Sequence, residues 1–206
     1  MPFVTLEGIE GCGKSTQARR LAEALGGRVL LTREPGGTPL GQGIRALLLD
    51  AAHLHIVPEA EVLLFFADRA QHVREVLRPA LAEGRLVISD RYLDSSLAYQ
   101  GHGRRLSLEL LQAVAELATG GLRPDLSLLL DLPVEAGLAR LAARGAANRL
   151  DAEPREFHER VREGYERLLA AEPGRWVRID AQGPETEVTG RLLGALRARG
   201  LAGALA

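Results

Sequence analysis

Apolar and polar positions along the chain follow two periods, which predict strands that alternate with helices. Short apolar runs rich in β-forming residues lie at Phe3 to Glu7, Arg28 to Thr32, Arg85 to Ser89, Leu126 to Leu132 and Trp176 to Ile179. The fourth run is almost continuously apolar, as in a buried central strand. The pattern therefore predicts an α/β fold: a five-stranded parallel sheet with helices on both faces and binding loops at the carboxyl ends of the strands.

Apolar residues at helical spacing fill the segments between these strands. Clear stripes are Ala18, Leu21, Ala22 and Leu25; Val62, Phe66, Ala70, Val73 and Leu77 within a helix from Pro58 to Leu77; and Phe157, Val161, Tyr165 and Leu168 beyond Pro154. Further helices are predicted over Ile44 to Leu49, Ser107 to Thr119, Val134 to Ala143 and Val188 to Leu196. Ser107 is placed as an N-cap, and Gly26 and Gly120 as helix ends.

Composition narrows the class of protein. The 206 residues, 46% hydrophobic and 26% charged, suit one globular domain over 1–206. The net charge of -1 lacks the basic excess of nucleic-acid-binding proteins. The longest uninterrupted apolar stretch, Val62 to Ala67, is too short for a membrane span, and the single cysteine excludes an internal disulfide. We expect a soluble, cytoplasmic protein. The five histidines show no metal-ligand spacing.

A phosphate-binding loop lies between the first strand and the first helix. Its residues match G-x-x-x-x-G-K-[ST], and they are Gly8, Ile9, Glu10, Gly11, Cys12, Gly13, Lys14 and Ser15, with Thr16 next in the helix. The glycines let backbone N–H groups surround phosphate oxygens, Lys14 reaches the β- and γ-phosphates, and Ser15 can ligate magnesium. Lys14 is the only lysine of the chain. We interpret Cys12 as a small loop residue rather than a redox switch.

The remaining motifs exclude two large classes of proteins with this loop. A switch GTPase carries an N-K-x-D motif, which a chain with its one lysine in the phosphate loop cannot have. An ATPase motor needs a longer chain and an apolar run that ends in acidic residues, whereas the nearest run ends Ser89-Asp90-Arg91. A small kinase remains.

The chain resembles the thymidylate kinase family along nearly its whole length. The motifs that carry the resemblance stand in the family's order: FVTLEGIEGCGKSTQ from Phe3, TREPGGT from Thr32, LFFADRAQ from Leu64, SDRYLDSSLAYQG from Ser89, PDLSLLLDL from Pro124 and an arginine-containing segment from Arg144 to Asp151. The resemblance implies ATP-dependent phosphorylation of dTMP to dTDP, with Mg²⁺ and in a homodimer.

The helix after Pro58 carries a second, polar face. Phe65 lies one position off the apolar stripe and shares a face with Glu61 and Arg69, so we expect that face to lie outside the core. By resemblance, Phe65 stacks on thymine and Arg69 contacts the base or its phosphate, whereas Phe66 is core. Packing of Phe65 against a neighbouring helix is the alternative.

Polar residues at the strand ends complete the predicted site. Arg33 and Arg91 close two strands, where the planar guanidinium matches a phosphate, and by resemblance both bind the dTMP phosphate together with Arg69. Asp90 is the carboxylate best placed to hold Mg²⁺, and Glu10 meets the sugar hydroxyl or the magnesium shell. By resemblance, Ser96 and Gln100 contact the thymine edge and Tyr99 excludes a ribose hydroxyl; a local backbone bond is the alternative for Ser96.

The small-residue segment over about 144–152 is predicted to be a mobile lid that supplies a catalytic arginine. Position 11 is glycine where some family members carry arginine, which by resemblance moves this role to the lid. Arg149 is the first choice and Arg144 the second, while Arg140 either stacks on adenine or is solvated.

Two other functions keep part of this pattern. A deoxynucleoside kinase shares the loop and the arginine-containing lid but phosphorylates a hydroxyl and needs a base. A non-catalytic nucleotide-binding protein needs a partner surface, which the sequence does not indicate.

Overall fold

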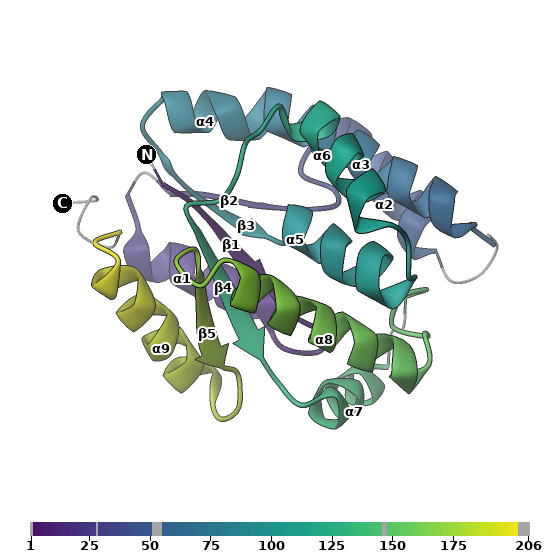
Figure 1. Cartoon of the computed structure of the whole chain (residues 1–206). Coiled ribbons are helices and arrows are strands. Elements are labelled where there is room, and N and C mark those ends of the chain that lie inside the picture. The colour runs from purple at the N-terminus through teal and green to yellow at the C-terminus, as the bar shows by residue number, and fades with distance from the viewer. Residues whose placement is uncertain (1, 28, 51–54, 146–147, 202–206) are drawn as a thin grey trace.

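A five-stranded parallel sheet forms the centre of the computed structural model, which describes residues 2–27, 29–50, 55–145 and 148–201 (Figure 1). The strands are β1 (Phe3–Glu7), β2 (Val29–Arg33), β3 (Leu86–Asp90), β4 (Leu126–Asp131) and β5 (Trp176–Asp180), in the spatial order β2-β3-β1-β4-β5. The predicted α/β fold is therefore confirmed. All four pairs of neighbouring strands run parallel, so the chain returns through a helical crossover each time.

Helices cover both faces of this sheet (Figure 1). They are α1 (Lys14–Leu25), α2 (Pro39–Leu49), α3 (Pro58–His72), α4 (Arg78–Ala82), α5 (Leu93–Ser96), α6 (Leu108–Thr119), α7 (Val134–Arg144), α8 (Arg155–Ala171) and α9 (Glu185–Ala198), with π-helical turns η1 (Val73–Leu77) and η2 (Leu97–Gly103). Because side chains alternate along a strand, β1 contributes to both layers. Val4 packs in the cluster that holds Leu21 of α1, and Phe3 in the cluster that holds Leu77 of η1.

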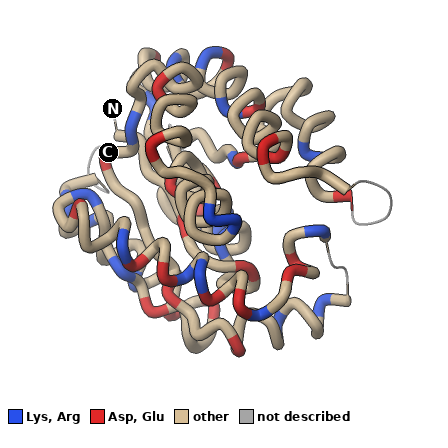
Figure 2. Tube along the Cα trace, turned by 45° about the vertical axis from the view of Figure 1, so that its right-hand side comes forward, with Lys and Arg blue, Asp and Glu red and all other residues tan. Residues whose placement is uncertain are grey.

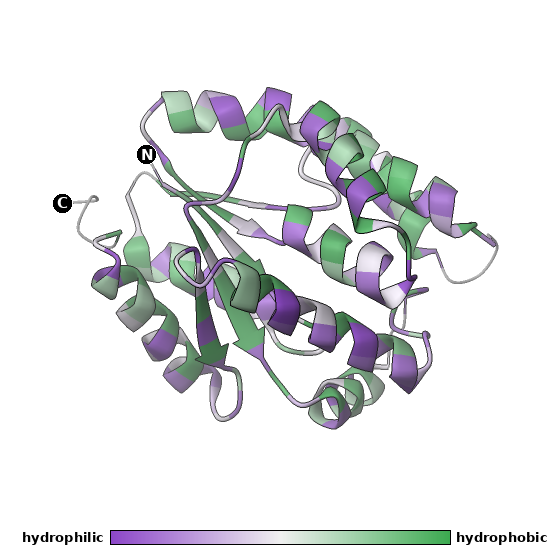
Figure 3. Ribbon diagram, viewed as in Figure 1, coloured by the Kyte–Doolittle hydropathy of each residue, from purple (hydrophilic) through white to green (hydrophobic). Residues whose placement is uncertain are grey.

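The apolar residues gather on the strands and on the inner faces of the helices (Figure 3). The main core cluster draws residues from β1 through α9, from Val4 to Leu196. On the outer helices both signs of charge are interspersed (Figure 2). Among the described helices, none combines the length and apolar character that a membrane crossing requires.

Several predicted boundaries change. The helix expected over Ile44 to Leu49 begins at Pro39, where Thr38 accepts a hydrogen bond from the Gly41 N–H at 2.9 Å. A Thr-Pro pair is typical of a helix start. The two glycines in the first half of α2 interrupt the helical pattern, so the sequence analysis placed the start too late. The helix from Pro58 continues through η1 to Ala82, and Pro154 precedes α8 rather than lying in its first turn.

The predicted N-cap at Ser107 and the predicted helix ends at Gly26 and Gly120 are confirmed. The Ser107 hydroxyl accepts a hydrogen bond from the Leu110 N–H at 3.2 Å, which makes it the predicted N-cap. Gly26 and Gly120 end α1 and α6 with positive φ angles of 56° and 54°.

Three strand ends meet at one edge of the sheet and place the functional residues. The register pairs Leu6 and Arg33 with Asp90 from either side. The phosphate loop after β1, the loop after β2 and the turn after β3 therefore converge, as expected for the carboxyl edge of an open α/β sheet.

Candidate active site

The phosphate loop wraps around the amino group of its own lysine. Lys14 Nζ donates to the carbonyl oxygens of Gly8 at 3.1 Å and Ile9 at 2.7 Å, and lies 3.3 Å from Cys12 Sγ. The loop packs closely on α7, because a Cβ at Gly137 would lie 2.6 Å from the carbonyl oxygen of Glu10. This contact fixes the position of the phosphate loop relative to α7.

A cavity of about 630 Å³ opens beside the loop and gathers most of the predicted site. Its lining includes these residues singled out from the sequence: Glu10, Gly11, Gly13, Lys14, Ser15, Thr16, Arg33, Phe65, Arg69, Asp90, Arg91, Ser96, Tyr99, Gln100, Arg140 and Arg144. Gly8, Ile9, Cys12 and Arg149 do not line it. Cys12 is buried under the loop, as a small packing residue would be.

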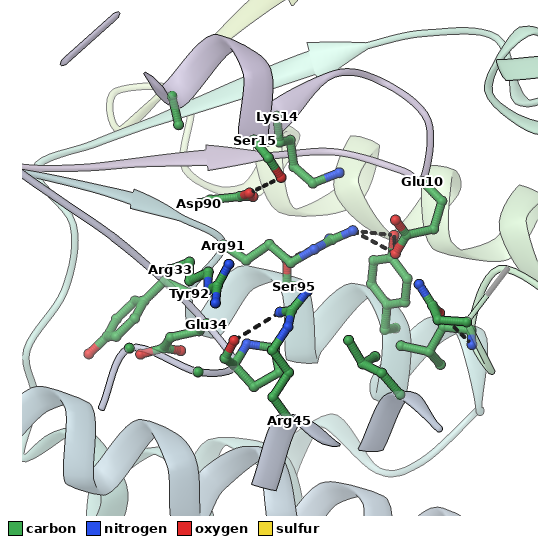
Figure 4. Close-up of a pocket in the computed structure, with 18 of the residues that line it drawn as sticks. Glu10, Lys14, Ser15, Arg33, Glu34, Arg45, Asp90, Arg91, Tyr92 and Ser95 are labelled. Atoms are coloured by element: carbon green, nitrogen blue, oxygen red, sulfur yellow. Dashed lines mark hydrogen bonds and ion pairs between the residues drawn. The ribbon is translucent and has the colours of Figure 1, made fainter. Parts of the chain in front are cut away.

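Ser15, in the first turn of α1, and Asp90, at the end of β3, face each other (Figure 4). Ser15 Oγ donates to Asp90 Oδ2 at 2.5 Å. The second oxygen, Asp90 Oδ1, is buried and has no hydrogen-bond partner among the described residues. A hydroxyl and a carboxylate with spare lone pairs suit a hard cation such as Mg²⁺, which needs few protein ligands.

Arg91 is held in a strained backbone conformation with φ of 72°. Its guanidinium donates to Glu10 Oε1 at 2.7 Å (Figure 4). It also donates to Tyr99 Oη at 3.1 Å. Burial favours a raised pKa for Glu10, but the charges of Arg91 and Lys14 outweigh it, so the pKa is lowered. Glu10 is therefore an ionised partner that orients Arg91.

Arg33 and Arg45 point toward Arg91 within the cavity (Figure 4). Arg45, on α2, donates to the carbonyl oxygen of Pro35 at 2.9 Å. Burial lowers its pKa, and so do the nearby charges of Arg33 and Arg91. A cluster of like charges that repel one another indicates a place for an anion.

Arg69 does not join this cluster, in contrast to the expectation from the sequence. It is 1% exposed, and its guanidinium donates to Glu34 Oε2 at 2.8 Å, to Ser96 Oγ at 3.0 Å and to the Tyr92 carbonyl oxygen at 3.0 Å. Arg45 is instead the third arginine of the cluster, beside Arg33 and Arg91. The sequence analysis missed it because the start of α2, which aims Arg45 at the cavity, was not recognised.

Glu34 links Arg69 to a buried polar network below the loop after β2. His72 Nδ1 lies 2.8 Å from Glu34 Oε1, and His72 Nε2 lies 2.7 Å from Thr32 Oγ1. Asp68 accepts a hydrogen bond from the Gly36 N–H at 2.9 Å. These contacts give His72 a structural role that its isolated position in the sequence could not reveal.

The polar face of α3 is not exposed, contrary to expectation. Phe66 is core and Phe65 is half-buried and lines the cavity, as predicted, but Glu61 is fully buried. The face is covered by polar groups of η2: Gln100 Nε2 donates to Glu61 Oε1 at 2.8 Å. Helical periodicity separates polar from apolar faces but does not show which polar faces meet.

The two arginines predicted for the lid, Arg149 and Arg144, lie in different surroundings. Residues 146 and 147 lie outside the described residues. Arg149 Nη2 pairs with Glu61 Oε2 at 2.6 Å instead of facing the phosphate loop. Arg144 lines the cavity, and its Nη2 donates to Asp151 Oδ2 at 2.7 Å. Of the two arginines predicted for the lid, only Arg144 therefore lines the cavity beside the phosphate loop.

A buried carboxyl behind Arg91 was also missed. Glu7 ends β1 and accepts hydrogen bonds from the Tyr92 N–H at 2.9 Å, Ser95 Oγ at 2.5 Å and Tyr165 Oη at 3.1 Å. Burial and the charge of Asp94 raise its pKa to about 8, against the hydrogen bond from Ser95. Glu7 thus fixes the turn that presents Arg91, and its place before the loop glycine was the available signal.

The chain is similar to proteins of one known family. The sequence profile of the thymidylate kinase family matches residues 6–191. A thymidylate kinase from Desulfosudis oleivorans is 52% identical over 204 residues, which cover 94% of this chain and 95% of that protein. One from Deinococcus radiodurans is 52% identical over 201 residues, with 96% and 97% coverage. The crystal structure of thymidylate kinase from Ehrlichia chaffeensis superposes with a TM-score of 0.78 at 30% identity, over 95% of this chain and 98% of that one.

Proposed function

Because the chain belongs to the thymidylate kinase family, we propose that its cavity holds ATP and dTMP end to end, with their phosphates between the loop and the arginine cluster. The enzyme transfers a phosphoryl group from ATP to dTMP, which yields dTDP. The observation that carries the proposed arrangement is that Arg33, Arg45 and Arg91 share one cavity with Lys14. Two anionic groups can therefore meet there without water between them.

At the donor end, the loop N–H groups from Gly8 to Gly13 and the amino end of α1, with Ser15 and Thr16, would bind the ATP phosphates. Lys14 would leave its contacts with the loop carbonyls for the β- and γ-phosphates. Arg140, whose guanidinium lies 3.4 Å from the Gly11 carbonyl oxygen, would border the adenine. Arg144 would offset charge on the transferring group.

At the acceptor end, Phe65 would stack on thymine, and Arg69, held by Glu34 and Ser96, would contact the base edge. Gln100 would add a second polar contact to that edge. Tyr99 and Glu10, whose polar oxygens lie 3.1 Å apart, would border the sugar and leave little room for a ribose hydroxyl; Glu10 would meet the sugar hydroxyl or the magnesium shell.

Mg²⁺ fits the pair Ser15 and Asp90, since Asp90 Oδ1 is a buried oxygen without a partner among the described residues. When bound, this cation neutralises phosphate charge as the transfer proceeds. Side chains of the protein would orient the acceptor and offset the remaining charge. The arginine cluster holds the acceptor phosphate in line, and Lys14 with Arg144 offsets the charge that develops on the transferred group.

The reaction needs no general base, because the acceptor phosphate is already ionised near neutral pH. A deoxynucleoside kinase, in contrast, must deprotonate a hydroxyl. The acceptor side of the cavity carries three guanidinium groups where such an enzyme needs a free carboxylate. Of the carboxylates that line the cavity, Glu10 is paired with Arg91, Glu34 is paired with Arg69, and Asp90 is hydrogen-bonded to Ser15. The monophosphate is therefore the better acceptor.

We also propose that the whole chain acts as one domain and that the enzyme is a cytoplasmic homodimer. ATP is supplied in the cytoplasm, and the free thiol of Cys12 is compatible with its reducing conditions. The exposed large hydrophobic residues support a self-association surface. Among the described residues, all of these but Leu31 lie on α2, α3 or α6, or directly before α3: Leu40, Leu47, Val57, Leu63, Leu108, Leu110 and Leu117. These helices pack side by side (Figure 1).

A coupled ADP-release assay tests the proposed site with ATP, Mg²⁺ and four acceptors: dTMP, dUMP, dCMP and thymidine. We expect fast turnover with dTMP, slower turnover with dUMP and none with thymidine, and loss of turnover in Lys14→Ala. Turnover with thymidine but not with dTMP would overturn the role of the arginine cluster. Turnover that needs no acceptor would indicate a nucleotide hydrolase.

A further inference from the structure

Two consecutive residues of α5 have different surroundings, because Ser95 lines the cavity and Asp94 does not. Ser95 Oγ accepts a hydrogen bond from Arg91 Nη1 at 3.1 Å and donates one to Glu7 Oε2 at 2.5 Å. Arg91 has a positive φ angle, which is unfavourable for a residue with a side chain, so its conformation depends on the contacts around it. The position of α5 therefore determines where Ser95 supports the guanidinium of Arg91.

Asp94 forms a buried ion pair with Arg175, the residue directly before β5. Arg175 Nη1 donates to Asp94 Oδ2 at 2.6 Å, and Arg175 Nη2 donates to Asp94 Oδ1 at 2.9 Å. The side chains of Arg175 and Asp94 are 14% and 4% exposed. A bidentate pair of this kind fixes orientation as well as distance, and salt screens it little when it is buried. The pair therefore fastens α5 to a segment that lies 81 residues further along the chain.

Buried hydroxyl groups join this ion pair to the centre of the sheet. Ser127 Oγ, on β4, donates to Asp94 Oδ2 at 3.0 Å, and Thr5 Oγ1, on β1, donates to Ser127 Oγ at 2.9 Å. Both of these residues are fully buried. On its other side, Arg175 donates through Nε to Glu172 Oε2 at 2.9 Å. Arg175 is thus held in place from two sides, and α5 is fastened to a rigid part of the fold.

The ion pair lies away from the substrates. Among the residues that line the cavity there is neither Asp94 nor Arg175 nor Ser127. Burial favours a lowered pKa for Arg175, but its hydrogen bonds and attraction to Asp94 and Glu172 outweigh burial and raise the pKa, so Arg175 is a permanent cation. A charged pair that touches no ligand affects the reaction only through the element that it positions, and here that element is α5.

We propose that Asp94 and Arg175 are positioning residues for the acceptor phosphate, because their ion pair fixes α5 against β4 and thereby holds Ser95 and the Arg91 guanidinium in place. Arg91 contacts the phosphate, and the pair acts through Arg91. This inference rests on the proposed function, since it assumes that Arg91 binds the phosphate of dTMP.

The cost of burying two charges supports positioning rather than stability as the role of this pair. Desolvation of a buried ion pair offsets much of its attraction, and apolar residues of the same size often give a fold that is equally stable. Apolar contacts have no preferred direction, however, so they would leave α5 free to rotate on the sheet. The expected defect is confined to the acceptor end, because Lys14 and Ser15 of the donor end lie on α1.

The test is a double-mutant cycle of Asp94→Asn and Arg175→Met, read out by calorimetric binding and by the melting temperature Tm. The two ligands are dTMP and the Mg²⁺ complex of a non-hydrolysable ATP analogue. We expect each single variant to bind dTMP about tenfold more weakly and the ATP analogue within about twofold of wild type, as for a small displacement of one binding group. Each single variant should also have a lower Tm, because a buried charge loses its partner.

The double variant separates positioning from stability. It leaves neither member of the pair as an unpaired buried charge, so its Tm should recover in part, while dTMP binding should stay about tenfold weaker because α5 is still not fastened. Recovery of dTMP binding together with Tm would mean that the pair contributes stability alone, and would overturn the inference. Equal losses of affinity for dTMP and the ATP analogue would overturn it as well.

A second cycle tests whether the pair acts through Arg91. Arg91→Ala removes the group that contacts the phosphate, so adding Arg175→Met to it should weaken dTMP binding no further. Arg175→Lys keeps one charged contact with Asp94 and should restore part of the dTMP affinity that Arg175→Met loses. A further loss of about tenfold in the Arg91→Ala background would show that the pair acts elsewhere.

Arg199→Met is the matched control. Arg199, an exposed residue at the end of α9, donates to the Gly174 carbonyl oxygen at 2.6 Å and so holds the same loop before β5 without contacting Asp94. This variant should bind dTMP as wild type does. If Asp94→Asn does not fold, the two Arg175 variants decide, and wild-type dTMP affinity in Arg175→Met contradicts the inference. Failure of the proposed function is separate, because Arg91→Ala by itself would then leave dTMP binding unchanged.

Discussion

At the residue scale, several charged side chains are buried, so the pKa of each depends on the charges and hydrogen bonds beside it. Asp68 is fully buried, one of its oxygens has no hydrogen-bond partner among the described residues, and Glu34 lies nearby. Burial and the charge of Glu34 raise the pKa of Asp68 to about 6, although the Gly36 N–H opposes this. The loop that follows Arg33 is therefore hydrogen-bonded, through Gly36, to a carboxyl whose pKa is raised to about 6.

The pH dependence of stability tests this directly. In the unfolded chain Asp68 ionises at the ordinary value of 3.8, so between about pH 4 and pH 6 the unfolded state releases a proton that the folded state keeps. The stabilising contribution of Asp68 is complete below pH 4 and is lost as pH rises through 6. In urea unfolding, the stability of wild type relative to Asp68→Asn should fall by up to about 3 kcal/mol over that window. A constant difference would contradict the raised pKa.

Arg45 is a second prediction at this scale. Arg45→Ala removes one of three guanidinium groups that face the acceptor phosphate, so the KM for dTMP should rise about 10- to 100-fold, as for the loss of a charged hydrogen bond. The KM for ATP should change little. Steady-state kinetics with Arg74→Ala, an exposed arginine of η1, as control measure both. Equal increases in the two KM values would place Arg45 outside the acceptor end.

At the element scale, the approach of α7 to the phosphate loop depends on the absence of side chains. Gly137 lies in α7 against Glu10, and a Cβ at Gly11 would lie 2.3 Å from the carbonyl oxygen of Gly137. The helix and the loop therefore meet backbone to backbone. A larger residue on either side must move the loop that binds the donor phosphates.

Gly137→Ala tests this contact against a matched helical glycine. Alanine is the better helix former, yet the new Cβ would lie 2.6 Å from the Glu10 carbonyl oxygen, so stability should fall by about 1–3 kcal/mol and the KM for ATP should rise. In α9, a Cβ at Gly190 meets nothing within 4 Å. Gly190→Ala should therefore raise the free energy of unfolding by about 0.5–1 kcal/mol. Urea unfolding measures the stability of both variants, and steady-state kinetics measure their KM for ATP. A Gly137→Ala variant more stable than wild type would show that the loop can shift to accommodate the new Cβ without loss of stability.

At the scale of the whole molecule, the exposed leucines of α2, α3 and α6 are the candidate contact surface of the proposed homodimer. Leu117 is 87% exposed and Leu63 is 63% exposed, and α6 packs against α3. Soluble proteins seldom expose contiguous apolar surface of this kind unless it binds another surface. A twofold pairing of identical patches is the commonest way to cover it.

Leu117→Glu should convert the proposed dimer into a monomer, because a carboxylate would be buried without a partner at the contact. Light scattering after size-exclusion chromatography measures the mass against the 22.2 kDa of one chain. Ala170→Glu, at an exposed position of α8, adds the same charge away from these helices and should leave the mass unchanged. A wild-type mass of one chain would refute the dimer, and a dimeric Leu117→Glu variant would refute this surface.

Features that depend only on neighbours along the chain could be predicted from the amino-acid sequence. The alternation of strands and helices, the caps at Ser107 and Gly120, and the loop that ends in Lys14 and Ser15 are local patterns, and each is set by backbone geometry within a few residues. Tertiary structure alone decided which charges meet. Arg69 is paired with Glu34, Arg149 with Glu61, and Arg45 stands beside Arg91 because elements distant in sequence pack together at one edge of the sheet. Helical periodicity distinguishes a polar face from an apolar one. It does not show which arginine will lie beside a carboxylate and which will face a cavity, because those neighbours come from distant parts of the chain.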